Sequence, residues 1–168
     1  NLLSMINDVL DYSKLRSERF ELVTEEYSLE SLIYDITTVA TIRLDEKPVE
    51  FMIYISSYVP GYVIGDMARV RQIINNIISN AVKYTASGGT VTIRITELDC
   101  DREDCVRIQT QVIDTGIGMS EEFLPSLFEP FTRERNTTAG KVAGTGLGMP
   151  IIKKYVDRMD GTIEAESK

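Results

Sequence analysis

The chain has 168 residues, of which 43% are hydrophobic and 26% are charged, an ordinary mix for a globular protein and too apolar for a disordered one. Eighteen basic and 26 acidic side chains give a net charge of −8, which argues against a nucleic-acid-binding protein, because that function needs a basic face. No histidine is present, so a Ser-His-Asp triad, a Cys-His pair and an HExxH zinc site are excluded. Any chemistry must use carboxylates, amides, lysines, backbone groups or a cofactor.

The two cysteines, Cys100 and Cys105, lie in one acidic stretch. Two thiols without a histidine make a poor zinc site, so we expect free thiols in a hairpin loop of a cytosolic protein. No apolar run approaches the ~18 residues that a membrane span needs, so we expect no direct membrane contact by this chain.

Residues 1–16 are predicted to form a helix, because apolar side chains recur on one face at heptad spacing. These side chains are Leu2, Met5, Val9 and Tyr12, with Leu3, Ile6 and Leu10 beside them. Such a broad stripe needs a partner helix, and no N-cap residue precedes it. We therefore expect the end of a longer helix that belongs to a bundle.

From residue 20 onward the pattern predicts a mixed α and β domain. Alternating polarity and β-branched residues predict strands at 20–27, 49–55, 62–64, 90–98, 106–113 and 161–166. The 3.6-residue period predicts helices at 29–45, at 67–84 after an Asp66 cap, at 120–127 after a Ser120 cap, and at 149–159. Residues 87–89 predict a turn and residues 132–146 a loop. The sum is an α+β sandwich, with helices on a mixed, mainly antiparallel sheet.

One face of the predicted helix at 67–84 is polar. Asn76, Asn80, Lys83 and Tyr84 recur at helical spacing, and the opposite face is predicted to be buried. An amide oxygen is a suitable ligand for Mg²⁺, and a lysine can meet a phosphate. Taken alone, the same pattern is consistent with a solvated polar face.

Three further segments carry glycine or aromatic patterns. Asp114-Thr-Gly116-Ile-Gly118 ends a predicted strand, where glycines allow close approach of a ligand and the carboxylate can accept from an exocyclic amine. Phe128-Glu-Pro-Phe131 precedes the predicted loop. Residues 144–149 place three alternating glycines before a helix, where exposed N–H groups favour an anion. Their spacing is GxGxG, which disfavours a dinucleotide-binding fold.

In this order, the four segments resemble the N, G1, F and G2 boxes of sensor histidine kinases. The resemblance covers residues 20–166, and residues 1–16 resemble the end of the second helix in that family's dimerisation hairpin. It implies a Bergerat-type two-layer α/β sandwich. It also implies that residues 1–19 are the hairpin end with its linker, and that residues 20–168 are the catalytic ATP-binding domain.

The resemblance implies that ATP and Mg²⁺ are the cofactors. Asp114 would bind the adenine amino group, Asn80 would ligate the Mg²⁺, and Asn76 would lie beside it as a catalytic residue. Lys83 would approach the phosphates, as a second catalytic residue, and Tyr84 would pack near the nucleoside. The remaining implied nucleotide-binding residues are Gly116 and Gly118 near the base, Phe131, Arg133, Arg135 and Lys141 at the lid, and Gly144, Thr145, Gly146, Leu147 and Gly148 around the triphosphate.

An asparagine at position 76 also indicates slow hydrolysis. Hydrolytic relatives resembling gyrase, MutL and the heat-shock ATPases carry a glutamate there as a base, and an amide cannot take a proton at neutral pH. We therefore expect the γ-phosphoryl group to be kept for a partner nucleophile. The phosphoacceptor histidine would lie on a helix upstream of Asn1, so this chain cannot phosphorylate itself.

The resemblance implies partners and a location as well. These are the protein's own dimerisation domain, a response-regulator receiver domain, a homodimer in the full-length protein, and a cytoplasmic position within a parent that can be membrane-anchored. The alternatives are a nucleotide-sensing or scaffold module without kinase activity, and a serine kinase of the anti-sigma type, which the helix at 1–16 disfavours.

Overall fold

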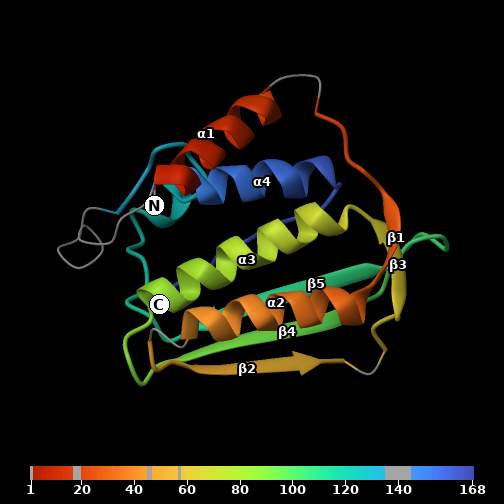
Figure 1. The fold of residues 1–168 in the computed structure, drawn as a ribbon, viewed down its shortest axis with the longest axis horizontal. Coiled ribbons are helices and arrows are strands. Elements are labelled where there is room, and N and C mark those ends of the chain that lie inside the picture. The colour runs from red at the N-terminus through yellow and green to blue at the C-terminus, as the bar shows by residue number, and fades with distance from the viewer. Residues whose placement is uncertain (1, 17–19, 45–46, 57, 135–144) are drawn as a thin grey trace. The chain divides into compact units, whose positions relative to one another are not determined.

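The computed structural model describes residues 2–16, 20–44, 47–56, 58–134 and 145–168. Its elements, labelled in Figure 1, fall into two compact units. Residues 24–117 form one unit, and residues 1–23 together with 118–168 form the other.

The larger sheet of the 24–117 unit is mixed. It has the strand order β2 (Glu50–Ile55), β4 (Thr90–Leu98), β5 (Arg107–Asp114). Strand β2 runs parallel to β4, and β5 runs antiparallel to it as a hairpin partner. A second, two-stranded antiparallel sheet pairs β1 (Glu25–Ser28) with β3 (Tyr62–Gly65). The predicted mixed sheet and hairpin are confirmed.

Helices α2 (Leu29–Leu44) and α3 (Met67–Tyr84) lie side by side on one face of the larger sheet (Figure 1). Every second residue of the central strand β4 points into the resulting core, because side chains alternate along a strand. The buried core residues are Leu29, Leu32, Ile36 and Ala40 of α2, Ile74, Ile78, Ala81 and Val82 of α3, Val91, Ile93 and Ile95 of β4, and Val49. This is the two-layer arrangement predicted for the domain.

The buried apolar side of helix α3 is narrower than predicted from the sequence. Ile74 and Ile78 are buried as predicted, but Ile73 and Ile77 are only half-buried and lie outside the core cluster. On a helix with 3.6 residues per turn, Ile73 and Ile77 share the side of Asn80 rather than that of Ile74. The polar face of α3 is therefore partly lined by isoleucine.

The second unit contains α1 (Leu2–Arg16) and α4 (Gly148–Arg158), which pack against each other (Figure 1). Leu15 is buried and Tyr12 is half-buried. Met5, Ile6, Val9 and Leu10 are all exposed. The apolar stripe predicted for this helix is thus real, and most of its described part faces solvent in this chain.

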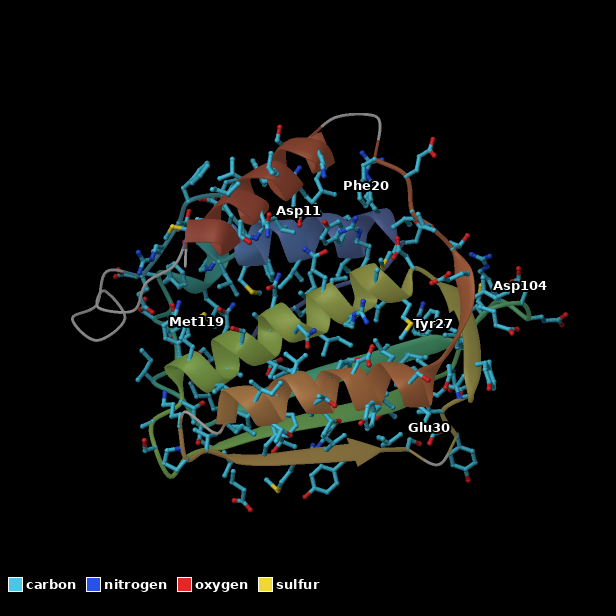
Figure 2. All side chains as sticks on the ribbon, in the orientation of Figure 1. Asp11, Phe20, Tyr27, Glu30, Asp104 and Met119 are labelled. Carbon is cyan, nitrogen blue, oxygen red and sulfur yellow. The ribbon has the colours of Figure 1, made fainter. Side chains whose placement is uncertain are left out.

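Three predicted elements are wrong in extent or type. The strand predicted at 20–27 begins only at Glu25, because β1 is limited to the four residues that pair with β3, and Phe20 instead packs on Tyr155 with ring centroids 5.5 Å apart. Figure 2 labels Phe20 in the segment that follows α1. Residues 161–166 form no strand, since alternation alone supplies no hydrogen-bonded neighbour.

The helix predicted at 120–127 is a set of turns around a short 3₁₀ helix, Leu124–Ser126. The Ser120 hydroxyl does accept a hydrogen bond from the Phe123 N–H, at 3.2 Å, as a cap would. Pro125 lacks an N–H group. It therefore cannot donate the backbone hydrogen bond that a regular helix beginning near residue 121 would need at that position.

The cysteine loop lies at the outer end of the β4–β5 hairpin, where Figure 2 labels Asp104. Cys100 and Cys105 are free thiols, as predicted. Desolvation is the main cause that raises the pKa of the Cys105 thiol, and the neighbouring Asp104 carboxylate raises it further. Across the described ranges no cluster of three or more His, Cys, Asp or Glu side chains could hold a metal ion. Among the described residues, no helix is both long and apolar enough to cross a membrane.

Asp66 is the N-cap residue of helix α3, as predicted. Its buried carboxylate accepts a hydrogen bond from the Arg69 N–H at 3.0 Å. Burial, with a smaller contribution from Asp66, also raises the pKa of the Tyr27 hydroxyl.

We expect Asp66→Ala to lower the free energy of unfolding by about 1 kcal/mol, because the substitution removes the cap of the longest helix. Urea denaturation followed by circular dichroism measures the change. Asp101→Ala, in the exposed hairpin loop, is the control and should stay within about 0.5 kcal/mol of the parent. Equal effects from the two substitutions would show that the cap contributes nothing.

Candidate functional site

The polar face of α3 has the predicted residues in place. Asn76, Asn80, Lys83 and Tyr84 are all half-buried, on the side of the helix away from the core residue Ile78. The Lys83 Nζ lies 5.1 Å from the centre of the Tyr84 ring. Cation–π attraction between the two holds the ammonium group over the aromatic face. The face therefore offers two amides, one ammonium group and one aromatic ring.

The C-terminal end of α3 is held by a residue that the sequence analysis did not identify. Lys47 Nζ donates hydrogen bonds to the carbonyl oxygens of Val82 and Lys83, both at 3.1 Å. A cation at a helix C-terminus satisfies orphan carbonyls and interacts favourably with the helix dipole. No sequence pattern links Lys47 to this helix end, because the two are 35 residues apart.

The turn after β5 carries the predicted carboxylate. Asp114 is exposed at the end of the strand, and its Oδ1 accepts a hydrogen bond from the Gly116 N–H at 2.8 Å. Ile117 N–H donates to the Tyr84 carbonyl at 3.2 Å. The turn and the end of α3 are thus one hydrogen-bonded structure.

Gly116 is required by this geometry. A Cβ atom at this position would lie 2.6 Å from Asp114 Oδ1 and 2.9 Å from the Tyr84 carbonyl oxygen. Real Cβ atoms do not approach other heavy atoms so closely, and one of the two neighbours is backbone that cannot swing aside. The close approach at Gly116 in this structure is therefore between the turn and the end of helix α3.

Thr115 fastens the same turn to the sheet. Its backbone N–H donates to the Thr90 carbonyl at 3.1 Å, and its Oγ1 accepts from the Thr90 N–H at 2.9 Å. Thr115 lies within the motif from Asp114 to Gly118, but no role was predicted for it. Its position between Asp114 and Gly116 was the signal that could have identified it.

In the other unit, Gly118 lies against the end of the chain. Its φ of +67° suits glycine, and a Cβ atom would lie 2.9 Å from the Lys168 carbonyl oxygen. The neighbouring Met119 N–H donates to Ser167 Oγ at 2.7 Å. The requirement for glycine at position 118 is thus explained by close packing on residues 167–168.

The glycine segment before α4 is joined to the aromatic turn that precedes the loop. Phe131 has a φ of +62° and is exposed, and its N–H donates to the Gly146 carbonyl at 3.0 Å. Gly146 has a φ of +70°, and a Cβ atom there would lie 3.0 Å from the Thr132 carbonyl oxygen. The predicted Phe131 and Gly146 therefore form one local structure.

Thr145, Leu147 and Gly148 complete the described part of this segment. Thr145 Oγ1 accepts from the Leu147 N–H at 3.2 Å, and the Leu147 side chain is almost fully buried. Gly148 begins α4, and a Cβ atom there would meet no described residue within 4 Å. Among the described residues no side chain or backbone therefore crowds Gly148, and the buried Leu147 anchors the start of α4.

Arg133 is exposed in the segment that follows Phe131. Arg135, Lys141 and Gly144, and most of the predicted loop at 132–146, lie outside the described residues. The structure therefore brings together two sets of predicted residues, one in each unit: Asn76, Asn80, Lys83, Tyr84, Asp114 and Gly116, and separately Phe131, Thr145, Gly146, Leu147 and Gly148.

Comparisons with known proteins bear on this arrangement. A family model described as "Histidine kinase-, DNA gyrase B-, and HSP90-like ATPase" matches residues 65–168. Two-component system protein A of Emericella nidulans is 38% identical over 96% of this chain and 24% of its own length. The signal transduction histidine-protein kinase BarA of Escherichia coli K12 is 36% identical over all of this chain and 18% of its own length.

A solved structure agrees with the sequence relatives. The crystal structure of full-length ShkA in complex with AMPPNP superposes with a TM-score of 0.79 at 29% identity, over 99% of this chain and 34% of that one. The present chain thus spans about a quarter or less of the sequence relatives it matches. It belongs to the histidine kinase-, DNA gyrase B- and HSP90-like ATPase family, and its sequence and fold are those of the catalytic ATP-binding domain of sensor histidine kinases.

Proposed function

We propose that this chain binds Mg-ATP and passes its γ-phosphoryl group to a histidine on a dimerisation helix of the same protein, in the cytoplasm. Residues 1–19 are the end of that helical hairpin with its linker, and residues 20–168 are the catalytic domain. The observation that carries the proposal is the Asp114–Gly116 turn, which is hydrogen-bonded onto the helix that presents the amide and lysine face.

Asp114 is suited to select adenine. One of its oxygens is occupied by the Gly116 N–H, and an ionised carboxylate has capacity for further hydrogen bonds. The exocyclic amine of adenine is a donor that such an oxygen accepts. Because the Gly116 bond fixes the rotation of the carboxylate, the acceptor is oriented before the base arrives. Tyr84, at the same hydrogen-bonded junction, packs near the nucleoside.

The donor set on α3 fits Mg²⁺. Magnesium in phosphoryl-transfer sites is held by one or two protein oxygens, with phosphate oxygens and waters as the other ligands. Asn80 supplies one amide oxygen from a half-buried position, and Asn76 lies one helical turn before it. When bound, the ion neutralises charge on the phosphates. Lys83, held near Tyr84, adds a cation on the same face.

Asn76 decides which acceptor receives the phosphoryl group. Its amide can orient a ligand or a water but cannot remove a proton from water at neutral pH. The imidazole nitrogen of a histidine needs no such base, because its lone pair attacks phosphorus directly while the bond to the β,γ-bridging oxygen breaks and ADP leaves. Catalysis is then positioning and charge stabilisation.

The start of α4 is suited to the phosphates. Its first N–H groups have no intrahelical partner, and the helix dipole favours an anion there. No described residue would crowd a Cβ atom at Gly148, which suits the approach of a phosphate to the backbone there. Gly144, Thr145, Gly146 and the loop cations Arg133 and Lys141 belong to the same proposal, while Gly118, Phe131 and Leu147 act by holding the backbone of the site.

The partners follow from the proposed reaction. A phosphohistidine is an activated phosphoryl donor, so a receiver domain of a response regulator is the expected acceptor, and the full-length protein is expected to dimerise through the hairpin. The alternative function is a nucleotide-binding scaffold that phosphorylates nothing. Retention of the amide pair and of both glycine segments favours the kinase.

Phosphotransfer to a supplied hairpin separates the two functions. We expect incorporation of labelled phosphate into a dimerisation hairpin of a related kinase that contains the histidine, and loss of the label when that histidine is replaced by alanine. ATP turnover by the chain alone should remain near background, because Asn76 cannot act as a base. Strong magnesium-dependent hydrolysis without a hairpin would contradict the proposal, and binding without any transfer would favour the scaffold.

Nucleotide titration tests the adenine site. We expect AMPPNP with Mg²⁺ to bind the parent chain, and Asp114→Asn to weaken binding by about ten- to a hundredfold, because a hydrogen bond to a charged group is lost. Calorimetry gives the affinities, and Asp101→Asn in the hairpin is the charge-matched control. An unchanged affinity in Asp114→Asn would remove Asp114 from the site.

Gly116→Ala tests the turn without changing charge. The added methyl group has no room beside the Tyr84 carbonyl, so the turn must shift, and we expect AMPPNP affinity to fall about tenfold or more. Gly61→Ala is the matched control, because a Cβ atom at Gly61 meets nothing within 4 Å. Equal affinities of the two variants would show that the close approach is not needed for binding.

A further inference from the structure

Helix α1 reaches the phosphate-binding segment through a carboxylate. The Thr145 hydroxyl donates a hydrogen bond to Asp8 Oδ2 at 2.8 Å. The Thr145 Oγ1 atom also accepts a hydrogen bond from the Leu147 N–H at 3.2 Å. Asp8 is half-buried, and all three residues belong to the same unit. A negative charge therefore lies one hydrogen bond away from the glycine segment that leads into α4.

A second residue of α1, one turn further along, contacts Phe131, which is hydrogen-bonded to this segment. The Tyr12 ring meets the edge of the Phe131 ring at 6.3 Å between centroids and an angle of 67°. Lys154 of α4 places its Nζ 5.6 Å from the centre of the Tyr12 ring. Since the Phe131 N–H is hydrogen-bonded to Gly146, Asp8 and Tyr12 both act on one structure.

These contacts explain which side of α1 is buried. Asp8, Tyr12 and Leu15 recur at i, i+4 and i+7, so they share one side of the helix, and Leu15 is buried there. The more apolar side, which carries Ile6 and Leu10, is exposed. Hydrophobic burial alone would favour the opposite rotation. The observed rotation is thus the one that gives Asp8 and Tyr12 their partners.

We propose that docked α1 is a built-in negative regulator of nucleotide binding, in which the Asp8 carboxylate and the phosphates of ATP compete for the Thr145–Gly148 segment. This inference rests on the proposed function, which assigns the phosphates to that segment. A bound triphosphate brings several negative charges close to Asp8, and like charges at such distances repel. Either the carboxylate leaves Thr145 or the nucleotide binds more weakly.

The competition is reciprocal. If docked α1 lowers the affinity for ATP by some factor, bound ATP must favour release of α1 by the same factor. Nucleotide binding would then free α1 and its exposed apolar side together. The state of the helix would report whether the site is loaded.

The first test is a charge-neutral substitution that keeps the acceptor oxygen. We expect Asp8→Asn to bind AMPPNP with Mg²⁺ about three- to tenfold more tightly than the parent in calorimetry at low ionic strength. The gain should shrink as salt is raised, because screening weakens a charge effect but not a packing effect. Asn7→Ala, at an exposed position of the same helix, is the control and should leave the affinity unchanged.

Hydrogen exchange supplies the second readout. In the parent chain, amides of residues 2–16 should exchange faster when AMPPNP is bound, and in Asp8→Asn this nucleotide effect should be smaller. An Asp8→Asn affinity that is equal to or weaker than that of the parent, or α1 amides that are more protected with nucleotide, would overturn the inference. A parent chain that binds no AMPPNP would instead refute the proposed function.

Discussion

The close approach of Gly116 to the Tyr84 carbonyl is the constraint on which the site of the 24–117 unit depends. It joins the end of the central hairpin to the end of α3, so that a strand-end carboxylate and a helix-face amide set belong to one rigid structure. Thr115 secures the turn to β4, and Lys47 secures the end of α3. The proposed nucleotide site is preorganised when built in this way, because few of its groups would have to be ordered on binding.

In the unit formed by residues 1–23 and 118–168, a different set of contacts holds the glycine segment. Its glycine segment is held by the buried Leu147 and by a backbone hydrogen bond to Phe131, and its polar surface is contacted by α1 through Asp8. In this way a helix that resembles part of a dimerisation hairpin and a segment suited to phosphates share a hydrogen bond. The proposed coupling between α1 and the nucleotide site needs no long pathway, since the side chains of Asp8 and Thr145 are in direct contact.

Much of the fold could be predicted because it depends on local rules. The Asp66 cap and the isoleucine period define α3, and the unbroken β-branched run defines β4. The failures occurred where pairing decides the outcome. Residues 20–24 and 161–166 alternate like strands but have no hydrogen-bonded neighbour strand, and Pro125 cannot donate the hydrogen bond that a helix beginning near residue 121 would need there. Asn80 and Asp114 are predicted site residues because they lie in motifs, whereas Lys47, which holds the end of α3, has no motif to identify it.

By itself, the sequence determined the class of chemistry. The absence of histidine excludes imidazole chemistry, and the resemblance to sensor histidine kinases implies a nucleotide site in which an amide stands at position 76 in place of a hydrolytic base. These are properties of side-chain types and spacing, which need no coordinates. Only the tertiary structure decided that Gly116 is needed for packing on Tyr84, that Ile73 and Ile77 leave the core, and that α1 turns Asp8 toward Thr145. The physical reason is that such contacts join residues far apart in the chain, and their geometry depends on how whole elements pack.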